Sequence, residues 1–296
     1  NTYSLTDGIS EKIYNKIINQ IIDKLPVLNE WHSDSILNKF GNINWNEAII
    51  ELHKPENVGK YKNNFYQRLA FDEIFSTFLV NSEIRQKIKK IKKISKKYNL
   101  EKQNDLIKKL EFKLTNDQKK TLDEINNDLS SSNKMFRLLQ GDVGSGKTIV
   151  SFLAAYNTVN AGFQVAVMAP TEILARQHFN FAKKLFPKNL DIELISGKSD
   201  YKTKKDVLDK LVNKKLDIIF GTHAIFQKKV SFKNLGLIII DEQHKFGVNQ
   251  RKRLSDKGGD NCDVLLMTAT PIPRTLTMTM YGDMDLSIIS EKPKSR

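Results

Sequence analysis

One segment constrains the fold of this chain more than any other: Gly141-Asp-Val-Gly-Ser-Gly-Lys147-Thr148. It has the spacing G-x-x-x-x-G-K-[ST] of a phosphate-binding loop. An apolar run from Met135 to Leu139 precedes it, and an apolar stretch from Ile149 to Val159 follows it. A strand before the loop and a helix after it are the context that this motif needs. The segment therefore predicts an α/β fold in which a polyphosphate lies between a strand and a helix.

The residue types of the loop fit that chemistry. The glycines let the backbone turn its amide N–H groups toward phosphate oxygens, and the positive end of the following helix adds to the attraction. Lys147 is expected to reach the β- and γ-phosphates, and the Thr148 hydroxyl to bind Mg²⁺. The predicted nucleotide-binding residues of the loop are Gly141, Asp142, Val143, Gly144, Ser145, Gly146, Lys147 and Thr148.

A second motif, Asp241-Glu-Gln-His244, follows the wholly apolar run from Leu235 to Ile240. Such a run is typical of a buried parallel strand. We expect neighbouring strands to bring this acidic pair beside the loop, with Asp241 in the Mg²⁺ shell and Glu242 as general base or water-positioning residue. The alternative is two acids in a solvated loop. The predicted catalytic residues are thus Lys147, Asp241 and Glu242, the predicted metal residues are Thr148 and Asp241, and the predicted cofactors are ATP and Mg²⁺.

A third candidate segment, Leu114-Thr-Asn-Asp-Gln118, lies upstream of the phosphate loop. The amide of Gln118 can pair with both the donor and the acceptor of the adenine edge, and the Phe112 ring can stack on the base. Thr115 alternatively fits an ordinary N-cap for a helix over Asp117–Leu129. Taken alone, Gln118 would be a surface side chain.

Apolar strands alternate with helical stretches through residues 113–296, which predicts a doubly wound parallel sheet flanked by helices. Residues 1–112 are expected to be mostly helical, with an N-cap at Ser10 and a helix over Trp45–His53. From Tyr61 to Tyr98 there is no Pro or Gly, so one long helix of up to ten turns is possible. The strand candidates are Met135–Leu139, Gln164–Met168, Asp191–Ile195, Asp217–Phe220, Leu235–Ile240 and Val264–Met267.

Charge is distributed unevenly along the chain, whose formal net charge is +14. Residues 84–112 hold 11 Lys or Arg against 3 Asp or Glu. The basic face over Arg85–Lys97 is either a solvated helix face or a contact for nucleic-acid phosphates. The single cysteine, Cys262, excludes an internal disulfide. Apolar runs are far shorter than the roughly 20 residues that a membrane span needs, so no membrane partner is expected.

The phosphate loop, Ala169-Pro-Thr-Glu172, the Asp-Glu-Gln-His motif and Thr268-Ala-Thr270 stand in the order typical of superfamily two helicases. Longer blocks resemble the bacterial members that act on branched DNA, as does the start of the chain. Transcription-repair coupling translocases are a related family, but they usually carry Asp-Glu-Glu-His, whereas this chain has Gln243. The longer blocks are Leu139–Thr148, Met168–Ala175, Ile240–Val248, Met267–Leu276 and Tyr281–Leu286.

The resemblance implies a RecA-like motor lobe over residues 113–296 and roles for further residues. His244, Thr268 and Thr270 are implied to couple the nucleotide state to the grip on DNA. Alternatively, the DNA-contacting residues are helix caps or tight turns, and His244 is a satisfied polar residue. The residues implied to contact the DNA backbone are Pro170, Thr171, Glu172, Gly197, Thr222 and His223.

For the intact protein, the resemblance implies ATP-driven fork regression and branch migration of four-way junctions. The family's second lobe would follow Arg296 and its wedge domain would precede Asn1, with residues 1–112 as the helical linker. We expect the isolated chain to hydrolyse ATP weakly without an arginine finger, which can contribute roughly 10³-fold. We also expect a monomer in the bacterial cytoplasm, at the nucleoid. The alternatives are a double-stranded DNA translocase that displaces a bound protein, a nucleotide- and DNA-binding module with little turnover, and a small-molecule kinase.

Overall fold

The computed structural model describes residue 8 and residues 10–53, 62–196, 201–227, 230–242, 259–270 and 282–292. Contacts between Cα atoms divide the chain into two compact units, Asn1–Val80 and Asn81–Arg296. Residues 81–112 thus belong to the same compact unit as the sheet, while the functional division at residue 113 stays a prediction. Among the helices within these ranges, none combines the length and the apolar character that crossing a membrane requires.

The first unit is helical, as its sequence predicts. Its centre is the buried guanidinium of Arg68, which donates to both carboxylate oxygens of Glu30 (3.0 and 2.9 Å), to Asp72 and to the carbonyl of Ile43 (3.2 Å). His32 Nε2 lies 2.7 Å from Asp72 Oδ1. The helices are α1 (Glu11–Ile22), α2 (Asp34–Leu37), η1 (Asn38–Phe40), α3 (Trp45–His53) and the start of α4 (Lys62–Lys90).

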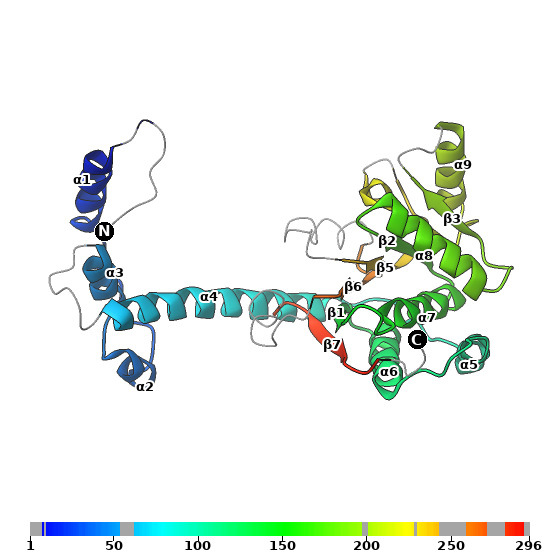
Figure 1. Ribbon diagram of the computed structural model, residues 1–296, viewed down its shortest axis with the longest axis horizontal. Coiled ribbons are helices and arrows are strands. Elements are labelled where there is room, and N and C mark those ends of the chain that lie inside the picture. The colour runs from blue at the N-terminus through cyan, green and yellow to red at the C-terminus, as the bar shows by residue number, and fades with distance from the viewer. Residues whose placement is uncertain are drawn as a thin grey trace. The chain divides into compact units, whose positions relative to one another are not determined.

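The second unit contains a sheet of seven parallel strands in the order β3-β4-β2-β5-β6-β1-β7 (Figure 1). The predicted doubly wound sheet is confirmed, and β7 is an additional strand beside β1. The strands are β1 (Phe136–Gly141), β2 (Gln164–Met168), β3 (Ile192–Ile195), β4 (Ile218–Gly221), β5 (Leu235–Ile240), β6 (Asp263–Thr268) and β7 (Asp285–Ile289). The helices are α5 (Leu100–Lys108), α6 (Asn116–Ser130), α7 (Lys147–Asn160), α8 (Glu172–Leu185), α9 (Tyr201–Val212) and η2 (His223–Phe226).

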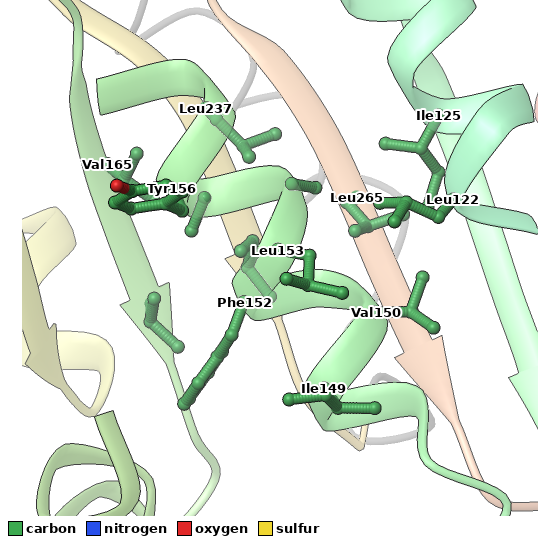
Figure 2. Packing of buried hydrophobic residues seen from close by; sticks show 14 of the residues in the cluster. Leu122, Ile125, Ile149, Val150, Phe152, Leu153, Tyr156, Val165, Leu237 and Leu265 are labelled. Atoms are coloured by element: carbon green, nitrogen blue, oxygen red, sulfur yellow. The ribbon is translucent and has the colours of Figure 1, made fainter. Parts of the chain in front are cut away.

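Successive strand residues point to opposite sides of the sheet. Both faces are buried because helices cover each of them. One face packs under α5, α6, α7 and α8, and the other packs against α9 and η2. Figure 2 shows α7 lying across the strands of this face, with Phe152 and Leu153 of the helix in the same apolar cluster as the strand residues Leu237 and Leu265. The apolar core therefore fixes the start of α7, and with it the phosphate loop.

The basic segment that was predicted to continue the long helix is instead extended after Lys90. Lys92 pairs with Asn133 in an isolated antiparallel bridge. Lys93 and Lys96 are fully buried, and their ammonium groups lie 2.6 and 2.7 Å from Asp263 Oδ2. The expectation of an outward helical face up to Lys97 is wrong, because these two lysines turn inward to a buried carboxylate. A phosphate contact is excluded for both of them.

Asp263 is the meeting point of three separate segments. Its Oδ1 accepts the Met135 N–H over 2.7 Å at the start of β1, while its Oδ2 accepts both lysines. Lys93 also donates to the carbonyls of Asp128 and Leu129, which lie in the last turn of α6. Burial lowers the pKa of Lys93, and the negative charge of Asp263 opposes that shift. Removing the carboxylate would leave two buried ammonium groups without their anion.

We predict that Asp263→Ala lowers the free energy of unfolding by about 3–5 kcal/mol, because two buried ammonium groups lose the carboxylate that both contact. The exposed neighbour Asp260 is a matched control, and Asp260→Ala should stay within about 0.5 kcal/mol. Urea unfolding followed by far-UV circular dichroism measures both, because the tryptophans Trp31 and Trp45 report on the other unit. A loss below about 1 kcal/mol for Asp263→Ala would show that the cluster is not stabilising.

Candidate nucleotide and nucleic-acid site

The phosphate loop joins β1 to α7, as its motif predicts. Gly144 and Gly146 have φ angles of 81° and 89°, in the left-handed region that glycine tolerates. A Cβ at Gly146 would lie 2.3 Å from the Gln118 amide nitrogen, so a side chain at this position would displace Gln118. The loop backbone is therefore shaped both by its own glycines and by a residue of α6.

Lys147 occupies the first position of α7 and is buried. Its ammonium donates to the carbonyls of Gly141 (2.6 Å) and Asp142 (2.9 Å). Burial lowers the Lys147 pKa, while the negative charges of Asp241, Glu242 and Asp142 oppose that shift. Both acids of the second motif therefore lie within electrostatic reach of the lysine, as the sequence predicts.

The other loop residues differ in their surroundings. Val143 is exposed at the tip of the loop, and the Asp142 carboxylate lies 3.1 Å from the Lys292 ammonium. Ser145 is buried, and its hydroxyl has no hydrogen-bond partner within the described ranges. Contact of these three side chains with a nucleotide stays a prediction.

Asp241 and Glu242 follow β5 at the same sheet edge as the loop. The strands β5 and β1 are not neighbours, because β6 runs between them. The expectation of adjacent strands is wrong in this respect. Adjacent strands lie about 4.8 Å apart, so the ends of β5 and β1, with β6 between them, are roughly 10 Å apart. A metal-bound phosphate chain can span that distance.

These residues fit Mg²⁺ as a partner of phosphates. Among the described residues, no group of three His, Cys, Asp or Glu side chains could form an all-protein metal cage. Mg²⁺ in such sites is bound through one or two protein oxygens together with substrate phosphates. The Asp241 carboxylate, with a Lys147 ammonium nearby, and the Thr148 hydroxyl at the start of α7 supply that kind of donor.

Gln118 is fully buried, so the expectation of a surface side chain is wrong. With Thr115 it forms a capping box at the start of α6: the Gln118 N–H donates to Thr115 Oγ1 (3.2 Å), and the Thr115 N–H donates to Gln118 Oε1 (3.0 Å). Its side-chain amide donates to the carbonyl of Ser145 over 2.7 Å. Gln118 thus ties the first turn of α6 to the phosphate loop.

A cavity of about 450 Å³ brings the predicted nucleotide residues together. Its lining combines the loop and α7 with Phe112, upstream of α6, and with α8. Sequence reasoning did not anticipate the α8 residues. The lining residues are Phe112, Gln118, Gly144, Gly146, Lys147, Thr148, Ile149, Gln177, His178 and Phe181.

The residues implied to contact DNA lie at the same sheet edge, after β2 and β4. Thr171 is the N-cap of α8, and its hydroxyl accepts the Leu174 N–H over 3.3 Å. Pro170 and Glu172 flank it, while Thr222 and His223 open η2 after β4. Gly197 lies outside the described residues. The structure confirms the cap at Thr171, and the DNA contacts stay a prediction.

Thr268 is the last residue of β6 and Thr270 lies just after it, so both stand between the end of β5, which carries the acidic pair, and the end of β1, which carries the phosphate loop. The hydroxyls of Thr268 and Thr270 lie 2.8 Å apart, and the Thr270 N–H donates to Thr268 Oγ1. His244, the third predicted coupling residue, lies outside the described residues. The two threonines thus stand beside the nucleotide strands, and their coupling role stays a prediction.

The chain matches a known family and several known proteins. The DEAD/DEAH box helicase family model matches residues 115–279. The chain is 43% identical over 298 residues to the ATP-dependent DNA helicase RecG of Streptococcus pneumoniae, covering 99% of this chain and 44% of that protein. It is likewise 43% identical to RecG of Thermotoga maritima, covering 38% of that protein. The chain therefore spans less than half the length of these relatives.

A solved structure of RecG bound to a three-way DNA junction has the same fold. It superposes with a TM-score of 0.76 at 40% sequence identity and covers 99% of this chain and 40% of that one. The match confirms the predicted RecA-like fold of the sheet and the helical segment before it.

We predict that Gln118→Ala weakens ATP binding about tenfold, equivalent to ~1.4 kcal/mol, and GTP binding less. Both losses follow from the lost support of Ser145, and the larger loss for ATP follows from the predicted adenine contact. Equilibrium titration with fluorescent analogues measures them, with exposed Lys120→Ala as the control on the same helix. Unchanged affinities would contradict the supporting role, and equal losses would contradict the adenine contact.

Proposed function

Because the chain belongs to the DEAD/DEAH box helicase family, we propose that it is the ATP-binding motor lobe of an ATP-dependent helicase for branched DNA. The observation that carries the proposal is the convergence of Lys147, Asp241 and Glu242 at one edge of the sheet. The resemblance to RecG over 99% of the chain supports branched DNA as the substrate.

Each site residue has a separate role in ATP binding or hydrolysis. The loop amides and Lys147 hold the phosphates, and Phe112 and Gln118 face the base. Thr148 and Asp241 would hold Mg²⁺, which shields the charge of the phosphates during transfer. Glu242 orients the attacking water and accepts its proton. The backbone φ of Glu242 is 52°, which turns this residue away from the direction of β5.

The DNA-contacting half of the site lies on β2, β4 and β3, beside the nucleotide half on β5, β6 and β1. N–H groups at the starts of α8 and η2 would suit phosphate oxygens of the DNA backbone. The net charge of +14 supports a polyanionic partner. Thr268, the last residue of β6, and Thr270, just after it, lie within the nucleotide half and would pass the nucleotide state to the DNA contacts.

The intact protein would regress forks and migrate four-way junctions by opening and closing two lobes around ATP. The partners that we infer are branched or double-stranded DNA and, within the intact protein, a second RecA-like lobe and a wedge domain. The chain covers 44% and 38% of the two RecG relatives, which supports these additional domains. The relatives are bacterial, which supports the inference that the protein acts in the cytoplasm, at the nucleoid. The monomeric state stays a prediction.

We predict that Lys147→Ala in the intact protein lowers ATP hydrolysis and fork unwinding at least about 100-fold, because a preorganised charge at the phosphates is lost. Fork binding should stay within about threefold, since the DNA contacts lie on other strands. Phosphate release and gel-based unwinding of a synthetic three-way junction measure the two effects.

Exposed Lys188→Ala is the matched control for charge, and we expect it to leave hydrolysis unchanged. Unwinding that persists in Lys147→Ala would contradict the nucleotide site. A wild-type protein that displaces a bound protein from linear duplex DNA but does not unwind the junction would favour the translocase alternative.

A further inference from the structure

A histidine far from Asp241 in the sequence contacts its carboxylate directly. His178 Nε2 lies 2.7 Å from Asp241 Oδ2, and both side chains are nearly buried. His178 is on α8, which follows β2, and it lines the same cavity as Lys147 and Thr148. The contact therefore joins a helix outside both nucleotide motifs to the predicted metal residue.

The chemistry of the carboxylate determines which partner donates the hydrogen bond. An ionised carboxylate only accepts hydrogen bonds, so the proton of this contact is on His178 Nε2. The imidazole is also restrained by packing, since its ring lies 6.0 Å from the Phe152 ring in an edge-on arrangement. Phe152 belongs to α7, the helix that begins at Lys147. The histidine is thus fixed by the phosphate-loop helix on one side and by the carboxylate on the other.

The second oxygen of Asp241 is restrained by the backbone. Its Oδ1 accepts the N–H of Glu242 over 3.0 Å. Asp241 is also anchored through its own N–H, which donates to the carbonyl of Met168 over 2.9 Å. With one donor on each oxygen, the carboxylate plane has a single orientation, and each oxygen keeps a lone pair for a further partner.

We propose that His178 is a positioning residue that holds the Asp241 carboxylate in the orientation required for Mg²⁺ bound to ATP. The proposal rests on the proposed nucleotide site and assigns it an additional residue. Partners that orient a metal-binding side chain commonly change metal affinity or activity 10- to 100-fold when they are removed. His178 acts through Asp241, so its loss changes the binding of the metal-nucleotide complex and not that of the nucleotide alone.

Two substitutions separate the hydrogen bond from packing. His178→Phe keeps a ring against Phe152 but has no donor, whereas His178→Gln can place an amide N–H near the position of Nε2. A fluorescent non-hydrolysable ATP analogue is titrated with Mg²⁺ on the full chain, and its affinity is measured again in EDTA. Asn180→Ala, at an exposed position on the same helix, is the control.

We expect His178→Phe to raise the Mg²⁺ concentration for half-maximal binding about tenfold or more, and His178→Gln to stay within about threefold of the wild type. Binding in EDTA should be unchanged in all variants. The inference is overturned if His178→Phe requires no more Mg²⁺ than the wild type, or if His178→Gln loses as much as His178→Phe. A wild type that does not bind the analogue would instead refute the proposed nucleotide site.

Discussion

All seven strands run in the same direction, so every loop that follows a strand leaves the sheet at one edge. This constraint places the phosphate loop, the acidic pair and the threonines after β6 together, although they lie far apart in the sequence. It also places the predicted DNA contacts after β2 and β4 on the same edge. The chemistry of the site therefore depends on the parallel pairing of strands and not on contacts among the motifs alone.

At the opposite edge of the sheet, an ion cluster anchors the amino end of β6. Asp263 opens β6 and binds Lys93, Lys96 and the Met135 N–H, whereas Thr268 ends the same strand beside the nucleotide site. One strand thus has a stabilising ion cluster at its amino end and candidate coupling residues at its carboxyl end. The extended segment after Lys90 is fixed to the sheet by this cluster, so Lys93 and Lys96 have a structural partner in Asp263.

Local patterns predicted much of this architecture. The strands β2 and β5 have the expected bounds, because β5 is a continuous apolar run and β2 is apolar after its first residue, Gln164. The strand β7 was not predicted, since Asp285 and Ser287 interrupt its apolar pattern. The helix end at Lys90 was missed because lysines are rarely buried, and only a distant carboxylate makes burial of Lys93 and Lys96 possible. Likewise, no local signal connects His178 with Asp241 or reveals that Gln118 supports Ser145.

We propose that Lys147, Thr148 and Asp241 share one metal-bound triphosphate, which spans the end of β6 between β1 and β5. Crystals grown with Mn²⁺ and a non-hydrolysable ATP analogue test it directly, because anomalous scattering locates the metal. We predict one metal peak in contact with the Thr148 hydroxyl and the β- and γ-phosphates, with Asp241 in its shell. A nucleotide bound with its metal remote from Asp241, or with Lys147 and Asp241 on separate cavities, would contradict it.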